Sequence, residues 1–197
     1  MGSIFQSLGK TITAGVVLLI VIILLAGGIS GTWVKMDHAW GMFFIRFLHV
    51  GAGVMWVGLL YYFNFVQTPS MPQIPDEQKP AVSKVIAPRA LFWFRHAALW
   101  TVILGLLLAT MNKYLVAALM FERPFTAIGI GMWLGLIMAF NVWFIIWPNQ
   151  KKALGIVTVS PEEKAAAAKT AGMTSRINTM LSIPMLFCMV AQQNGGL

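Results

Sequence analysis

His49 is the residue of this sequence best placed to do chemistry, because it lies well inside a long apolar stretch. Gly53 at i+4 and Trp56 at i+7 share its face of a helix. A neutral imidazole is a common iron ligand, and small residues beside it leave room for a flat cofactor. Arg46 at i−3 lies on the same face and could hold a haem propionate. The spacing is therefore compatible with haem ligation by His49.

A purely structural interpretation fits the same residues. Glycines in membrane helices often mark places where two helices pack closely, and a lone histidine can form a hydrogen bond between helices. Ionisable groups inside a membrane are nevertheless costly and mark functional sites by default. Both interpretations of His49 remain open on spacing alone.

His96 is the second histidine that could ligate iron, so His49 and His96 are the two candidate metal ligands. It lies near the start of a later apolar stretch, beside Arg95. We estimate that His49 and His96 differ in depth by several Å across a hydrocarbon core of roughly 30 Å. Helix tilt could absorb that difference, but an interfacial histidine beside Arg95 explains the pattern equally well.

Other chemistries lack the residues that they need. The predicted spans contain no Asp or Glu at mid-membrane depth, which argues against a proton pump or a cation-coupled transporter. The single cysteine, Cys188, excludes an internal disulfide and any multi-cysteine metal site. The polar residues Asn64, Gln67 and Asn141 are predicted to form hydrogen bonds between helices.

The composition shows where these residues must lie. Of the 197 residues, 58% are apolar and only 10% are charged, and the mean hydropathy is +0.78. Soluble proteins carry about 25% charged residues, so a soluble domain, a disordered chain and a nucleic-acid binder are all excluded. We expect one membrane domain over residues 1–197, in an all-α fold: a polytopic membrane helical bundle.

Five transmembrane helices are predicted from runs of about 20 apolar residues. A further amphipathic or interfacial helix is expected at about 161–175, because Ser160 can cap it and Pro161 can begin it. The fifth span is short by itself, and this Ala-rich helix is expected to lead into it. Asp37 is a suitable N-cap for the second span. The predicted spans are residues 12–29, 40–66, 90–110, 125–147 and 177–191.

The cations predict the orientation of these spans. With five spans, one side carries ten cations and the other carries four, which places the N-terminus in the cytoplasm and the C-terminus outside, in a bacterial inner membrane. The ten are Lys10, Lys79, Lys84, Arg89, Arg95, Lys151, Lys152, Lys164, Lys169 and Arg176, and the four are Lys35, Arg46, Lys113 and Arg123.

Three stretches carry a family resemblance: Phe47–Asn64, Asn141–Lys152 with the sequence NVWFIIWPNQKK, and Ser182–Met185. Together they resemble the membrane domain of the bacterial cytochrome-c-linked urate hydroxylases, the urate oxidase N-terminal family. The histidine pattern also resembles copper-resistance D-type proteins and the haem-b proteins that oxidise protoporphyrinogen. The resemblance implies an intramembrane redox role, and His49 matches the haem-ligand position of the last group.

The sequence departs from the urate hydroxylases in two respects. Those proteins carry a C-terminal cytochrome c domain, which the present sequence lacks, so a separate cytochrome c is an expected partner. Histidines of the family align with Gly129, Ile177 and Gln193 here. If those histidines are needed for the full reaction, this chain does not perform it alone.

The sequence therefore predicts a haem-b-binding inner-membrane protein, acting as an electron-transfer or accessory subunit of a larger complex. One alternative is a urate-hydroxylase-like oxidoreductase that passes electrons to a separate cytochrome c. Another is a cofactor-free structural subunit. Besides the lipid bilayer, the expected partners are other membrane subunits or a second copy of the chain. The Gly131 and Gly135 face would contribute to that association, or else would pack the chain's own helices.

Overall fold

The computed structural model describes residues 2–196. The chain is 83% helical, and the described residues contain no strand, which confirms the all-helical class. Two compact units can be distinguished by their internal contacts, Met1–Gly41 and Met42–Leu197.

The first unit is built around one aliphatic helix. A short helix α1 (Gly2–Phe5) precedes α2 (Leu8–Ser30), which contains the span predicted at residues 12–29. Gly31 ends α2 in the left-handed conformation, with a φ of 68°, as is common after a helix C-terminus. The only buried residue of α2 is Gly27, where an added Cβ would lie 2.9 Å from the Trp33 ring.

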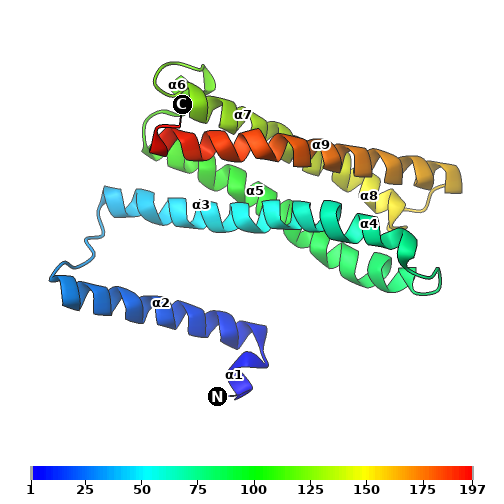
Figure 1. Ribbon diagram of the computed structural model, residues 1–197, viewed down its shortest axis with the longest axis horizontal. Helices are drawn as coiled ribbons and strands as arrows, with labels where there is room; N and C mark the ends of the chain where they lie inside the picture. The colour runs from blue at the N-terminus through cyan, green and yellow to red at the C-terminus, as the bar shows by residue number, and fades with distance from the viewer. Residues whose placement is uncertain (1, 197) are drawn as a thin grey trace. The chain divides into compact units, whose positions relative to one another are not determined.

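The rest of the chain is a series of long helices joined by short ones (Figure 1). Asp37 caps α3 as predicted, since its Oδ1 accepts a hydrogen bond of 2.9 Å from the backbone N–H of Trp40. The elements after α2 are α3 (His38–Tyr61), η1 (Tyr62–Gln67), α4 (Thr68–Ser70), η2 (Met71–Gln73), η3 (Ala81–Ile86), α5 (Ala87–Met111), α6 (Leu115–Leu119), α7 (Thr126–Phe140), η4 (Asn141–Ile146), α8 (Trp147–Ala153) and α9 (Pro161–Asn194).

Four helical segments within residues 2–196 are long and apolar enough to cross a membrane. The first three of them contain the first three predicted spans. The fourth begins at Thr126, one residue after the start of the span predicted at 125–147. These segments are Leu8–Ser30, His38–Gln73, Ala81–Met111 and Thr126–Ala153.

The last part of the chain is one continuous helix, as expected from a helix after Ser160 that leads into the fifth span, but it is not among the four segments that are long and apolar enough to cross a membrane. The interfacial helix expected at 161–175 and the span expected at 177–191 form one helix, α9, which continues through Pro184. Ser160 caps it as predicted, with its Oγ accepting a bond of 3.2 Å from the backbone N–H of Glu163. Hydrogen bonds from its own backbone N–H and from Ser160 lower the pKa of Glu162.

Within residues 42–197, α9 packs along α7, η4 and α8, while α7 also contacts α5 and α6. The interior of this bundle contains polar side chains as well as apolar ones. Asn178 is fully buried; its Oδ1 accepts a bond of 2.8 Å from Asn141 Nδ2, and its own amide donates to the Met138 carbonyl at 3.0 Å. Asn64 likewise donates to Ser175 at 2.8 Å. The interhelical bonds predicted for Asn64 and Asn141 are therefore confirmed, whereas the side-chain oxygen of Gln67 is buried without a hydrogen-bond partner among residues 2–196.

Candidate functional site: a cavity between four helices

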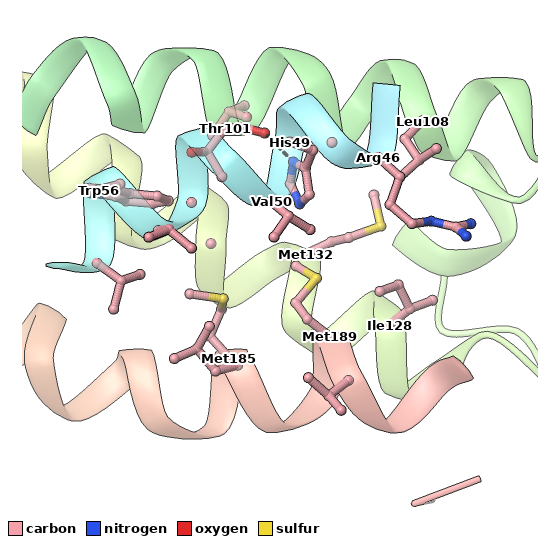
Figure 2. Close-up of a pocket in the computed structure, with 18 of the residues that line it drawn as sticks. Arg46, His49, Val50, Trp56, Thr101, Leu108, Ile128, Met132, Met185 and Met189 are labelled. Atoms are coloured by element: carbon pink, nitrogen blue, oxygen red, sulfur yellow. Dashed lines mark hydrogen bonds between the residues drawn. The ribbon is translucent and has the colours of Figure 1, made fainter. Parts of the chain in front are cut away.

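A cavity of about 580 Å³ lies within the bundle, lined by residues of α3, α5, α7 and α9 (Figure 2). Its walls are mainly apolar side chains and glycines, with a few polar groups. Volumes of about 300–1,000 Å³ with this composition are typical of cofactor and small-molecule sites. His49, Arg46, Gly53 and Trp56 all line this cavity. Four of the five residues singled out from the sequence are thus brought together.

The imidazole of His49 is held by the neighbouring helix. Its Nδ1–H donates to the backbone carbonyl of Thr101 in α5, at 2.8 Å. Because a carbonyl can only accept, this bond places the proton on Nδ1 and leaves a lone pair on Nε2. Nε2 has no hydrogen-bond partner among residues 2–196. Metal-ligating histidines are commonly oriented in this way by a carbonyl behind them.

Gly105 makes this position of the imidazole possible. A Cβ built on Gly105 would lie 2.8 Å from His49 Cε1 and 3.2 Å from its Nδ1, so any larger residue would displace the ring. The glycines on the helix of His49 behave differently. Gly53 would meet only Thr101 Cγ2, at 3.9 Å, and Gly58 would meet nothing within 4 Å. These two glycines thus line open space, whereas Gly105 forms a close contact.

Two buried donors at the cavity have no hydrogen-bond partner among the described residues: Arg46 Nε and Trp56 Nε1. A buried donor without an acceptor is costly, and an acceptor on a ligand would remove that cost. Tyr114 also lines the cavity. Burial raises the pKa of Tyr114, and the nearby positive charge of Arg46 partly offsets this. The Arg46 end of the cavity is thus suited to an anionic group such as a carboxylate.

The wall formed by α7 and α9 contributes thioethers. Met132, Met185 and Met189 line the same cavity as His49, and Figure 2 shows all three among its labelled residues. Thioethers and imidazoles are both established axial ligands of haem iron. No group of three or more His, Cys, Asp or Glu side chains able to hold a metal ion occurs in residues 2–196. The soft donors of this cavity are therefore one imidazole and three sulfurs.

His96 is not among the residues that line this cavity. Its Nδ1–H donates to the Phe92 carbonyl, one turn back in α5, at 2.7 Å. The imidazole lies tilted by 34° against the Phe92 ring, with centroids 4.2 Å apart, and makes an edge-to-face contact with Trp143 at a centroid distance of 5.8 Å. The structure thus places His96 in an aromatic cluster and does not bring it to His49.

The comparisons with known proteins bear on one wall of the site. A model of the family described as urate oxidase N-terminal matches residues 120–195. The chain resembles the urate oxidase N-terminal family over these residues. No curated protein and no solved structure matches the chain. The matched residues include α7 and α9, which carry the three methionines, whereas His49 lies on α3, outside the match.

The three positions at which the urate oxidase N-terminal family was expected to carry histidine have different surroundings. Gln193 lines the cavity, while Ile177 is 45% exposed. A Cβ on Gly129 would lie 2.0 Å from the carbonyl oxygen of Ala118, so this backbone leaves no space for a side chain there. Only Gln193 therefore stands where a side chain could reach a ligand in the cavity.

Thr101 and Gly105 are the residues in contact with the His49 imidazole that sequence reasoning did not connect with His49. Thr101 acts through its backbone carbonyl, which every residue type possesses, so no side-chain pattern could have revealed it. Gly105 did stand out as a glycine within a Leu-rich stretch. Its role becomes visible only because α5 lies against the imidazole of another helix.

Proposed function

We propose that the chain is a haem-b-binding protein of the bacterial inner membrane that acts in electron transfer, as a subunit or accessory of a larger redox complex. The observation that carries this proposal is the state of His49. Its imidazole is fixed by the Thr101 carbonyl and leaves Nε2 free within a cavity of about 580 Å³. A free, oriented imidazole in an apolar cavity suits axial ligation of a haem.

The remaining residues fit the same group. His49 would hold the iron, and the partnerless Nε of Arg46 suits a propionate. Gly53 leaves space beside the imidazole. Trp56 forms the buried floor at 1% exposure. When bound, haem b supplies one-electron redox chemistry.

The five-span topology is part of this proposal. The four membrane-length segments and α9 would cross the bilayer in alternating directions, with the N-terminus inside and the C-terminus outside. A continuous α9 of 34 residues would be about 51 Å long at 1.5 Å per residue, enough to cross the core and extend beyond it. A C-terminal reporter accessible from outside intact spheroplasts is the expected result, and a protected reporter would contradict the orientation.

The decisive experiment is a reduced-minus-oxidised spectrum of the purified chain and its histidine variants. We expect a haem-b spectrum from the native chain and none from His49→Ala. His96→Ala is the matched control and should keep the spectrum, since His96 does not line the cavity. A changed spectrum in His96→Ala would restore His96 as the second ligand. The absence of haem from the native chain would favour the structural-subunit alternative.

A second candidate function is supported by the family match at residues 120–195. In this alternative the chain is a urate-hydroxylase-like oxidoreductase that passes electrons to a separate cytochrome c. Reduction of added cytochrome c that depends on urate would distinguish it from an electron-transfer subunit. Gln193, which lines the cavity at a position expected to be histidine in the family, argues for the electron-transfer role.

A further inference from the structure

A group of positively charged and aromatic residues surrounds the indole of Trp147, which does not line the cavity. The guanidinium carbon of Arg95 lies 4.0 Å from the centre of the Trp147 ring and 5.2 Å from that of Phe92. Lys151 Nζ lies 5.8 Å from the same indole. We call Arg95, Trp147 and Lys151 the basic cluster. The contact of Arg95 with Trp147 joins α5 to α8. Trp143, in η4, adds a hydrogen bond of 3.1 Å from its Nε1 to the Arg95 carbonyl.

The two charges of the basic cluster are uncompensated. Within residues 2–196 the ion pairs are Lys79 with Asp76 and Lys152 with Glu163. Lys152, next to Lys151, is thus already neutralised by a bond of 2.6 Å, whereas neither Arg95 nor Lys151 has a carboxylate partner there. Stacking on an indole holds a cation in place but leaves its charge for another ligand.

The surroundings of the cluster indicate where that ligand comes from. Phe92 is 44% exposed and Trp93 is 57% exposed, and their rings contact each other edge to face. Exposed aromatic residues at the end of a span are typical of the boundary between the hydrocarbon and the headgroups. Both cations also belong to the larger set of ten, on the side proposed to be cytoplasmic. Anionic lipids are attracted to basic groups on that side.

We propose that the basic cluster binds the phosphate of an anionic phospholipid, with Phe92 and Trp93 lying against the start of its acyl chains. Arg95 contributes the planar donor pair that suits phosphate oxygens, and Lys151 contributes a second positive charge. The site is separate from the cavity and needs no haem. It rests on the membrane insertion proposed above.

The test measures lipid retained by the purified full chain in mild detergent, by native mass spectrometry. The native chain should retain phosphatidylglycerol in preference to phosphatidylcholine. Arg95→Gln and Lys151→Gln should each weaken phosphatidylglycerol binding about fivefold, which corresponds to about 1 kcal/mol per cation. Arg95→Lys should lose less than Arg95→Gln. Lys152→Gln is the matched control and should bind as the native chain does.

Several outcomes would overturn the proposal. Equal retention of the two lipids would remove the preference for an anionic headgroup. A loss in Lys152→Gln as large as in Lys151→Gln would mean that binding follows net charge rather than this cluster. Displacement of the lipid by an equal concentration of inorganic phosphate would mean that the cluster recognises phosphate alone. If Arg95→Gln fails to fold, Lys151→Gln and the salt dependence of the native chain decide the question. The haem spectrum is recorded in parallel, so loss of lipid binding and absence of haem are separate results.

Discussion

α2 and α9 are opposites in composition and in burial. α2 is the most apolar of the four membrane-length segments, yet Gly27 is its only buried residue. α9 is not among those four segments, yet it supplies much of the interior of the second unit. Its buried residues recur every three or four positions: Ala167, Ala171, Thr174, Asn178, Ser182, Met185, Cys188 and Ala191.

The contrast between α2 and α9 is expected for a chain in a lipid bilayer, which is the environment proposed above. Lipid tails are as apolar as leucine, so an aliphatic side chain gains nothing by leaving the bilayer for a protein interior. Close packing and hydrogen bonds drive the association of membrane helices, and both favour small or polar residues. The small and polar residues of α9 accordingly mark the interior of the second unit, although they give the helix no strong hydropathy.

The largest effect is expected where a glycine permits two backbones to touch. Gly129→Ala would place a methyl group 2.0 Å from the Ala118 carbonyl oxygen, which belongs to the backbone and can yield only if α6 moves. We expect a loss of about 1–3 kcal/mol in unfolding free energy, measured by titration with a denaturing detergent. Gly15→Ala in α2, which meets nothing within 4 Å, is the control. Equal stability of the two variants would remove the contrast.

A second substitution tests close packing at the site itself. Gly105→Ala would put a Cβ 2.8 Å from His49 Cε1 and should turn the imidazole away from the Thr101 carbonyl. Overpacking of this size costs about 1–3 kcal/mol, so haem retention should fall about tenfold. Gly51→Ala, on the helix of His49 with nothing within 4 Å of its Cβ position, should retain haem normally. Full retention in Gly105→Ala would show that Gly105 does not position the ligand.

Removing the buried amide of Asn178 in α9 should lower the unfolding free energy more than removing the exposed hydroxyl of Thr13 in α2. Asn178→Ala removes bonds to Asn141 and to the Met138 carbonyl and should lower the unfolding free energy by about 1 kcal/mol. Thr13→Ala in α2 removes an exposed hydroxyl that bonds only to its own helix, and should leave the same denaturation midpoint unchanged. A destabilised Thr13→Ala would indicate that α2 is packed in a way that its exposure does not suggest.

The smallest effect is expected when many aliphatic residues of α2 are replaced at once. The six Val and Ile residues between positions 16 and 25 can all be replaced by Leu. Because α2 buries only Gly27, any aliphatic residue should serve there, and both the N-terminal orientation and the haem spectrum should stay as in the native chain. Reporter fusions and the difference spectrum check these two outcomes. Loss of either property would mean that the shape of these side chains is recognised by another helix.

The Gly131 and Gly135 pair illustrates a choice that the sequence left open. A Cβ on Gly131 would lie 3.1 Å from Cys188 Cβ on α9, so this glycine packs the chain's own helices. Gly135 has nothing within 4 Å of its Cβ position and lines the cavity. Association with another subunit remains a prediction, but Gly131 is already used within the chain.

The sequence by itself determined the features that depend on a single segment. Of the five spans predicted from runs of apolar residues, four coincide with membrane-length helices, because the length and hydropathy of a segment need no partner. The capping roles of Asp37 and Ser160 were likewise predicted correctly, since a cap bonds within its own first turn. The shared helical face of Arg46, His49, Gly53 and Trp56 was readable as well, and all four line one cavity.

Only the tertiary structure decided what depends on a neighbouring helix. The burial of α9 is one example, because a helix buried through Ala, Thr, Asn and Ser has no hydropathy signal. His96 and His49 were both plausible ligands by depth, but the rotation of α5 directs Thr101 and Gly105, rather than His96, to the cavity. The orientation of His49 rests on a backbone carbonyl and on a missing Cβ. A backbone carbonyl and a missing Cβ leave no chemically distinctive side chain in the sequence. Their contact with His49 is therefore visible only when α3 is packed against α5.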